Sequence, residues 1–198
     1  MDEPPVTRLP VFVDDFVLRR IGPTDVHDLL EYWSDPQVVQ YQFWGPLTCE
    51  SIVALIDSQR SVMAGDPGVA FVLAVELENK VIGDCQLTVT SVDDRQAEIG
   101  FAFHPRFLGR GIASRAVASA IGFGFVQLGL HRIVAATDVR NERSWRLMER
   151  LGMRREAHFI HETFAKGQWV DAFVYAILDE EWKQLHSELL PYLVLDHS

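Results

Sequence analysis

Two glycines two positions apart lie between a predicted strand and a predicted helix. The segment His104-Pro-Arg-Phe-Leu-Gly-Arg-Gly-Ile-Ala-Ser-Arg-Ala116 contains Gly109 and Gly111, with Arg106 and Arg110 beside them. Glycine lets a ligand approach the backbone closely, and the first N–H groups of a helix lack internal partners at its positive dipole end. The segment therefore predicts a binding site for a diphosphate group.

The same glycines can be compared with known phosphate loops. The sequence contains no GxxxxGK[ST] segment, which excludes a P-loop. Gly109-Arg-Gly-Ile-Ala-Ser114 approaches the dinucleotide fingerprint GxGxxG/A, but Ser114 replaces the third small residue, and the chain after it ends in a predicted antiparallel hairpin. A nucleotide-binding oxidoreductase is therefore a less favoured alternative, as is a glycine turn without a ligand.

Other residue types could move protons. Asn141 and Ser144 lie three positions apart on a predicted helix and so share one face, although Asn141 is also a good capping residue in its own right. Glu98 lies on a predicted strand, and His161 and Glu162 lie on a later one. Each could accept a proton, and the alternative for Glu98 is a structural carboxylate.

The elements that must position these residues follow from apolar periodicity and from turn residues. Strands are predicted at 16–21, 69–77, 80–91, 96–104, 131–137, 153–164 and 168–178, and helices at 24–34, 36–41, 48–63, 110–128, 141–150 and from 179 onward. This order indicates one mixed α/β domain around a central sheet. We expect a loosely ordered N-terminus over 1–14, a single domain over 15–185 and a C-terminal tail over 186–198.

Composition limits the class of protein. The formal net charge of −10 argues against nucleic acid as a partner and is compatible with a cationic amine. Apolar runs are too short to span a bilayer, no leader pattern is present, and Cys49 and Cys85 form no disulfide framework. The seven histidines show no metal-ligand spacing. We expect a cytoplasmic protein with no metal, membrane or nucleic-acid partner.

Arg106-Phe-Leu-Gly-Arg-Gly111 resembles the Q/R-x-x-G-x-G/A motif with which GNAT N-acetyltransferases bind the pyrophosphate of acetyl-CoA. Further motifs resemble, in order, the ribosomal-protein N-terminal acetyltransferase branch: Leu18-Arg-Arg20, Asp25, Trp33-Ser-Asp-Pro36, Ala97-Glu-Ile-Gly100, Leu128-Gly-Leu-His-Arg-Ile133, Asn141-Glu-Arg-Ser144, Leu151-Gly-Met153 and Lys166-Gly-Gln-Trp-Val-Asp171. The resemblance covers roughly residues 16–183. It implies the GNAT fold, an α/β fold with a mostly antiparallel sheet of six to seven strands, a splayed central pair and flanking helices.

The resemblance also implies acetyl-CoA as co-substrate. Its pantetheine arm would lie along the strand before the glycine bend, where a backbone N–H near Phe101 or Ala102 would face the thioester oxygen. Ser144 would protonate the leaving thiolate. The implied cofactor-binding residues are Phe101, Ala102, Phe103, Arg106, Leu108, Gly109, Arg110, Gly111, Ile112, Ala113, Asn141 and Ser144.

The general base is less well defined by the resemblance. The branch often has a glutamate where this chain has Thr163, and the adjacent Glu162 points to the opposite strand face unless a bulge intervenes. The candidate catalytic residues are Ser144, Glu98 and Glu162. Phe43 and Trp44, in an aromatic loop, are the candidate substrate contacts.

Together these features predict an acetyl-CoA-dependent N-acetyltransferase that acts on a primary amine by direct transfer. The acceptor would be a protein N-terminal α-amine or a small-molecule amine. The alternative, motivated by Thr163, is a CoA-binding module with little or no transferase activity. The apolar tail at 189–195 is expected to pack either on its own domain or across a homodimer contact.

Overall fold

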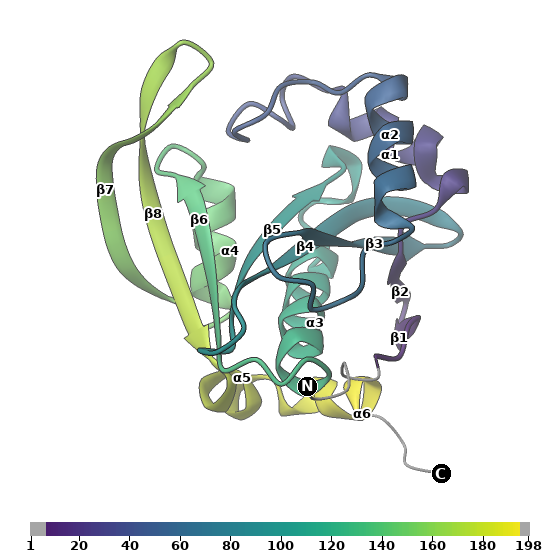
Figure 1. Cartoon of the computed structure of the whole chain (residues 1–198), viewed down its shortest axis with the longest axis vertical. Helices are drawn as coiled ribbons and strands as arrows, with labels where there is room; N and C mark the ends of the chain where they lie inside the picture. Colours follow the sequence, from purple (N-terminus) through teal and green to yellow (C-terminus); the bar gives the residue numbers. More distant parts are fainter. Residues whose placement is uncertain (1–6, 195–198) are drawn as a thin grey trace.

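The computed structural model describes residues 7–194, which form one eight-stranded sheet with helices on both faces (Figure 1). The strand order is β1-β2-β3-β4-β5-β6-β8-β7. All neighbours pair antiparallel except β5 and β6, which are parallel. The mixed, mostly antiparallel sheet predicted from the sequence is confirmed, with eight strands rather than six to seven.

The strands are β1 Val11–Val13, β2 Phe16–Arg20, β3 Ala70–Leu77, β4 Lys80–Ser91, β5 Gln96–Phe103, β6 Arg132–Asp138, β7 Arg154–Ala165 and β8 Gln168–Leu178. The α-helices are α1 Val26–Trp33, α2 Cys49–Gln59, α3 Ile112–Val126, α4 Glu142–Arg150, α5 Asp179–Leu185 and α6 Leu190–Leu193. Short 3₁₀ turns occupy Pro23–Asp25, Pro105–Phe107 and Ser187–Leu189.

Local sequence signals account for several boundaries. Glu78 and Asn79 both have positive φ, at 51° and 61°, as a two-residue turn between antiparallel strands requires. The Thr48 hydroxyl caps α2 by accepting a hydrogen bond from the Ser51 N–H at 3.2 Å. Gly152 follows α4 with φ of 80°, the left-handed conformation that often closes a helix.

The two faces of the sheet carry separate apolar clusters. Ile99 and Ile133 face α3, where they pack with buried residues such as Ile121. Val72 and Ala74 face the other way, toward the cluster that α1 and α2 contribute to. Because strand side chains alternate between faces, each strand of this central region packs against both layers.

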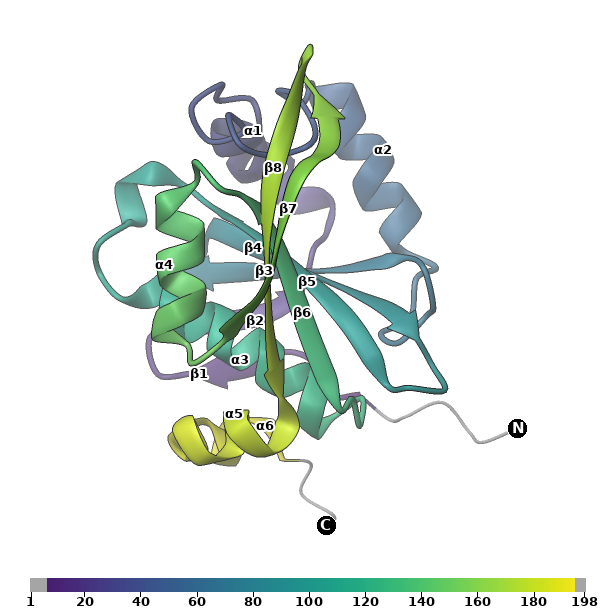
Figure 2. The ribbon, with the colours of Figure 1, turned by 90° about the vertical axis from the view of Figure 1, so that its left-hand side faces the viewer.

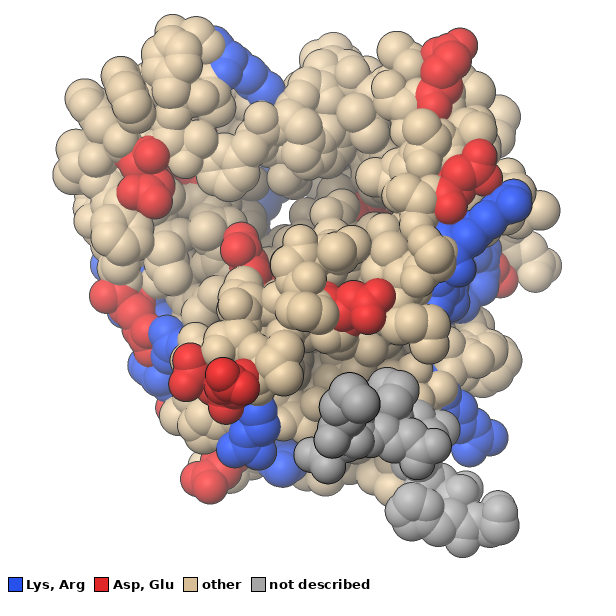
Figure 3. Space-filling view, viewed as in Figure 1, with Lys and Arg blue, Asp and Glu red and all other residues tan. Residues whose placement is uncertain are grey.

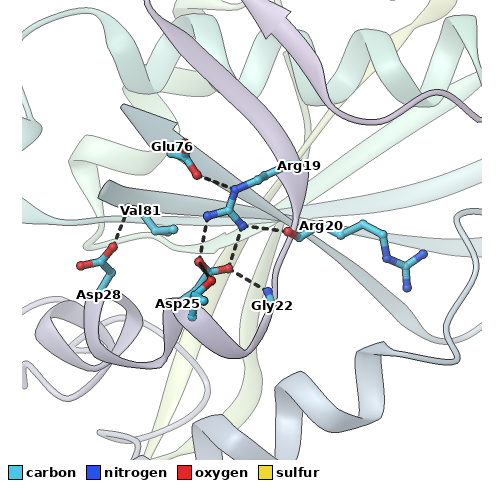
Figure 4. A network of polar contacts seen from close by, with 8 residues as sticks. Arg19, Arg20, Gly22, Asp25, Asp28, Glu76 and Val81 are labelled. Carbon is cyan, nitrogen blue, oxygen red and sulfur yellow. Dashed lines mark hydrogen bonds and ion pairs between the residues drawn. The ribbon is translucent and has the colours of Figure 1, made fainter. Parts of the chain in front are cut away.

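An ion-pair network fixes α1 against the sheet (Figure 4). The Arg19 guanidinium on β2 donates to both carboxylate oxygens of Asp25 at 2.8 Å and to Glu76 on β3 at 2.5 Å. Asp28 accepts from the Val81 N–H at 2.8 Å. The Leu18-Arg-Arg20 and Asp25 motifs therefore have a structural role, since they hold the helix that walls one side of the molecule.

The C-terminal segment packs on its own domain beneath α3 (Figure 2). The Trp182 indole N–H donates to the Ala118 carbonyl at 3.0 Å, and Leu189 and Leu193 are buried in the main cluster. The first of the two expected positions for this tail is thus observed over residues 187–194. The homodimer stays a prediction.

Two predictions about the early chain need correction. Within the stretch 1–14, expected to be loosely ordered, Val11–Val13 form β1 with both valines buried, while residues 1–6 lie outside the described part. The helix expected over 36–41 is instead a series of turns, in which Asp35 accepts from the Gln37 N–H at 2.8 Å. An aspartate side chain that bonds its own backbone competes with the helix.

Candidate functional site

A gap opens between the two parallel strands. β5 and β6 pair only through Gln96↔Arg132, Ala97↔Ile133 and Glu98↔Val134, and then separate. The expected splayed pair is therefore present. A pocket fills the gap, lined by Tyr41, Gln42, Phe43, Ile99, Gly100, Phe101, Ala136, Thr137, Asn141, Ser144 and Met148. We call it the gap pocket.

The register of β5 decides which backbone groups face this pocket. The His104 N–H donates to the Ile82 carbonyl of β4 at 2.9 Å, so by antiparallel alternation Ala102 also pairs with β4. Phe101 then points its N–H and carbonyl toward the gap, where its carbonyl accepts from Gln42 Nε2 at 3.5 Å. Of the two backbone groups proposed to face a thioester, the register favours Phe101 and turns Ala102 away.

The start of α4 brings the polar pair to the same pocket. Asn141 is the N-cap, and its Oδ1 accepts from the Ser144 N–H at 3.3 Å. The capping role is thus observed, and both residues also line the gap pocket. Ser144 is half-buried beside them.

The glycine bend has the geometry of an anion cradle at the start of α3. Gly109 and Gly111 have φ of 78° and 77°, and Gly111 is the N-cap, without a side-chain cap bond. A Cβ added at either glycine would meet no atom within 4 Å, so open space lies beyond the backbone. The first intrahelical bond runs from Arg115 N–H to the Gly111 carbonyl, which leaves the preceding amides to face outward.

The remaining predicted diphosphate residues surround this bend. Arg106, Leu108 and Arg110 are exposed, Ala113 is half-buried and Ile112 is buried in the core. The Arg106 N–H donates to His104 Nδ1 at 3.1 Å, which fixes the 3₁₀ turn before the bend. The residues present therefore fit a diphosphate, with backbone donors and two exposed cationic side chains.

The candidate bases differ in position. Glu98 lies at the closed end of the gap, on the sheet face that α1 and α2 cover, and is not among the residues that line either pocket. Desolvation by its surroundings raises the pKa of its carboxyl although the side chain is exposed. Glu162 is exposed and lines neither pocket among the described residues.

A bulge does interrupt β7 next to Glu162. Between Phe159↔Ala172 and Thr163↔Val170 the strand has two residues more than its partner, and His161 takes φ of 53°. Thr163 keeps the position opposite Val170, whose side chain lines the second pocket described below. The bulge therefore does not bring Glu162 to a pocket.

The aromatic loop divides in two. Phe43 is 49% exposed and lines the gap pocket. Trp44 instead packs edge-on against Trp33, with ring centroids 5.9 Å apart, and joins the cluster of α1 and α2. Phe103 is likewise a core residue, at 9% exposure.

A second pocket adjoins the first and shares Tyr41, Gln42 and Phe43 with it. It is also lined by Gln40, Asp138, Arg140, Ala165, Lys166, Gln168 and Val170. We call it the hairpin pocket. Its charged residues Asp138, Arg140 and Lys166 were not predicted as site residues from the sequence. Asp138 and Arg140 directly follow a predicted strand, the kind of position where α/β sheets often bind ligands.

One acidic cluster lies outside these pockets. His27, Asp28 and Glu31 group on α1 in a way that could hold a metal, but Lys80 Nζ already lies 2.7 Å from Glu31. Within residues 7–194, no helix is long and apolar enough to cross a membrane.

Comparison with known proteins places these features in a family. Residues 15–154 match the model of the acetyltransferase (GNAT) domain. The chain is 33% identical over 167 residues to the uncharacterized N-acetyltransferase YnaD of Bacillus subtilis, covering 84% of this chain and 95% of the relative. It is 27% identical over 169 residues to the spermidine N(1)-acetyltransferase of Escherichia coli K12, covering 85% and 89%.

A solved structure agrees with these matches. The GNAT-family acetyltransferase of Bacillus anthracis superimposes with a TM-score of 0.77 at 30% identity, covering 87% of this chain and all of that one. The oxidoreductase alternative is thereby overturned. The chain belongs to the GNAT family of acetyltransferases, and acetyl-CoA is its acetyl donor.

Proposed function

We propose that the protein transfers the acetyl group of acetyl-CoA directly to a primary amine in a ternary complex. The observation that carries this proposal is the gap pocket, which is lined by both Phe101 and Ser144. The glycine bend follows the same strand, β5, after a short 3₁₀ turn, so a diphosphate there and a thioester in the gap would belong to one extended ligand.

The chemistry assigns one task to each group. An alkylamine with a pKa of ~10.4 is mostly protonated at neutral pH, so a base must take its proton before the nitrogen attacks the thioester carbon. Glu98, which lies at the closed end of the gap but does not line the pocket, serves as this base through water, and its raised pKa improves it as a proton acceptor. The Phe101 N–H stabilises the developing oxyanion, and Ser144 gives a proton to the departing thiolate.

Binding measurements and a thiol-release assay test the proposal. Calorimetric titration with CoA, acetyl-CoA, NAD(P) and ATP should give micromolar CoA binding and no response to the other nucleotides. Acetyl-CoA and an amine panel should then release free thiol. CoA binding without transfer to any amine at any pH would support the alternative of a CoA-binding module.

Ser144→Ala tests the acid role. We expect turnover to fall about tenfold because a thiol of pKa ~8.5 leaves with modest help, while CoA affinity stays within twofold. The matched control is Ser58→Ala on α2, whose hydroxyl bonds only its own helix. Unchanged turnover in Ser144→Ala would remove Ser144 from this role.

A further inference from the structure

The hairpin pocket has an electrostatic character different from the rest of the molecule. Viewed from the side shown in Figure 3, the surface is hollowed between the β7–β8 hairpin and the α1–α2 side, with basic side chains at the hairpin rim and inside the hollow and acidic ones at its lower and right-hand edges. Among the residues lining the two pockets, the charged ones are Asp138, Arg140 and Lys166. Two cations and one carboxylate thus gather here in a chain of formal net charge −10.

The single carboxylate is already neutralised. Asp138 is 2% exposed and accepts from Arg140 Nε at 2.9 Å, from Arg140 Nη2 at 2.5 Å and from the Arg140 N–H at 2.9 Å. These bonds use Nε and Nη2, so Nη1 is left for another acceptor. The guanidinium remains 46% exposed and lies 5.8 Å from the centre of the Tyr41 ring.

The second cation has neutral partners. Lys166 lies in the two-residue turn of the hairpin, and its Nζ donates to the Gln40 carbonyl at 3.1 Å and to the Val39 carbonyl. Within residues 7–194 it forms no ion pair. Burial lowers the pKa of this ammonium, an effect that the charge of Asp138 partly opposes. An anion beside Lys166 would relieve that cost.

We propose that the acceptor is a primary amine that also carries a carboxylate, which Arg140 and Lys166 bind in the hairpin pocket. The inference deepens the proposed function and rests on it. The amine would enter the gap pocket, from which water carries its proton to Glu98, and the carboxylate would face the two cations of the hairpin pocket. A polyamine such as spermidine, the substrate named for the Escherichia coli relative, would place a second cation where the pocket offers no free carboxylate.

Matched acceptor pairs test this inference. The specificity constant kcat/KM is measured for several α-amino acids and their C-terminal amides. It is also measured for a dipeptide, for the amide of that dipeptide and for spermidine. The amide has the lower amine pKa, about 8, and so is the better nucleophile at neutral pH. For the preferred acceptor, we expect kcat/KM of the carboxylate form to be at least tenfold higher than kcat/KM of the amide. We expect spermidine to have the lowest kcat/KM of all the acceptors. The dipeptide arm distinguishes a free amino acid from a peptide chain as the carboxylate source.

Variants identify the cation responsible. Lys166→Met should reduce the carboxylate-to-amide ratio to about threefold or less, and Lys166→Glu should favour the amide and spermidine. The ratio is informative even if the loss of the carbonyl contacts slows both substrates equally. Lys183→Met is the control, because Lys183 pairs with Asp179 on α5.

Three results would overturn the inference: equal rates for acid and amide, a preference for spermidine, or an unchanged ratio in Lys166→Met. Transfer to amines without carboxylate preference would refute the acceptor class alone. CoA binding without transfer to any amine would refute the proposed function as well.

Discussion

Asp84 is a fully buried carboxylate on β4, and we predict that Asp84→Asn changes the pH dependence of stability. Its Oδ1 accepts from the Tyr32 hydroxyl at 2.9 Å and from the Trp33 indole N–H at 2.8 Å, and its Oδ2 accepts from Gln86 Nε2 at 3.1 Å. Desolvation outweighs these bonds and raises the pKa of Asp84 from 3.8 to about 6. Asparagine can keep the bonds to Oδ1 but cannot ionise.

The size and sign of the effect follow from this shift. Because the folded-state pKa is higher than the unfolded one, the native state binds more protons between pH 3.8 and about 6. The free energy of unfolding therefore falls as pH rises through that window, and ionised Asp84 costs about 3 kcal/mol above it. Roughly 2 kcal/mol of that cost should appear between pH 4.5 and pH 8.

Urea unfolding of the wild type and Asp84→Asn at several pH values measures the effect. At each pH we subtract the unfolding free energy of the wild type from that of Asp84→Asn. This difference should be about 2 kcal/mol larger at pH 8 than at pH 4.5. The bond from Gln86 favours the ionised form of Asp84, and its pH-dependent part is already contained in the pKa of about 6, so it needs no separate correction. A substitution effect that is the same at both pH values would refute the reasoning, because it would mean that burial does not raise the pKa of Asp84.

Three further substitutions test the site and the core. Gly111→Asp should lower CoA affinity at least about a hundredfold, measured by calorimetry, because it adds a negative charge and an unfavourable left-handed side chain at the cradle; retained affinity would mean that the cradle lies elsewhere. Glu98→Gln should reduce kcat/KM by about a hundredfold or more. It should also remove the fall of activity that the wild type shows as pH drops through the raised pKa of Glu98, and an unchanged profile would exclude it as the base. Gly122→Ala should lower the free energy of unfolding by about 2 kcal/mol, since the new Cβ would lie 2.3 Å from the Trp182 ring, whereas Gly45→Ala, with no atom within 4 Å, should be neutral in the same urea titration.

Local sequence signals predicted the framework of the fold and part of the site. The glycine bend could be located because Gly109 and Gly111 need left-handed backbone at a strand-to-helix connection, a requirement written into residue type and spacing. Asn141 and Ser144 could be paired because helix geometry fixes neighbours three positions apart. β1 escaped prediction because three residues are too few to show a period, and its strand exists only through pairing with β2.

Other features depended on contacts between distant parts of the chain. Phe101 rather than Ala102 faces the gap because the β4–β5 register sets the direction of each backbone group, and sequence alone does not fix register to one residue. The position of Thr163 and Glu162 depended on a bulge in β7. Trp44 packs against Trp33 because α1 has an apolar surface beside the loop. The loop sequence alone does not indicate this contact.

The sequence by itself determined the glycine bend that we propose binds a diphosphate, the polar pair at the start of α4 and the family, since each depends on residues close together in the chain. Only the tertiary structure brought together the charged residues of the proposed acceptor site. Asp138 is the last residue of β6, Arg140 follows two positions later, and Lys166 lies in the turn before β8. They line one pocket because β8 pairs antiparallel with the whole of β6. The interaction between two charges depends on the distance between them in space. For residues this far apart along the chain, that distance is set by the tertiary fold and not by the local sequence pattern.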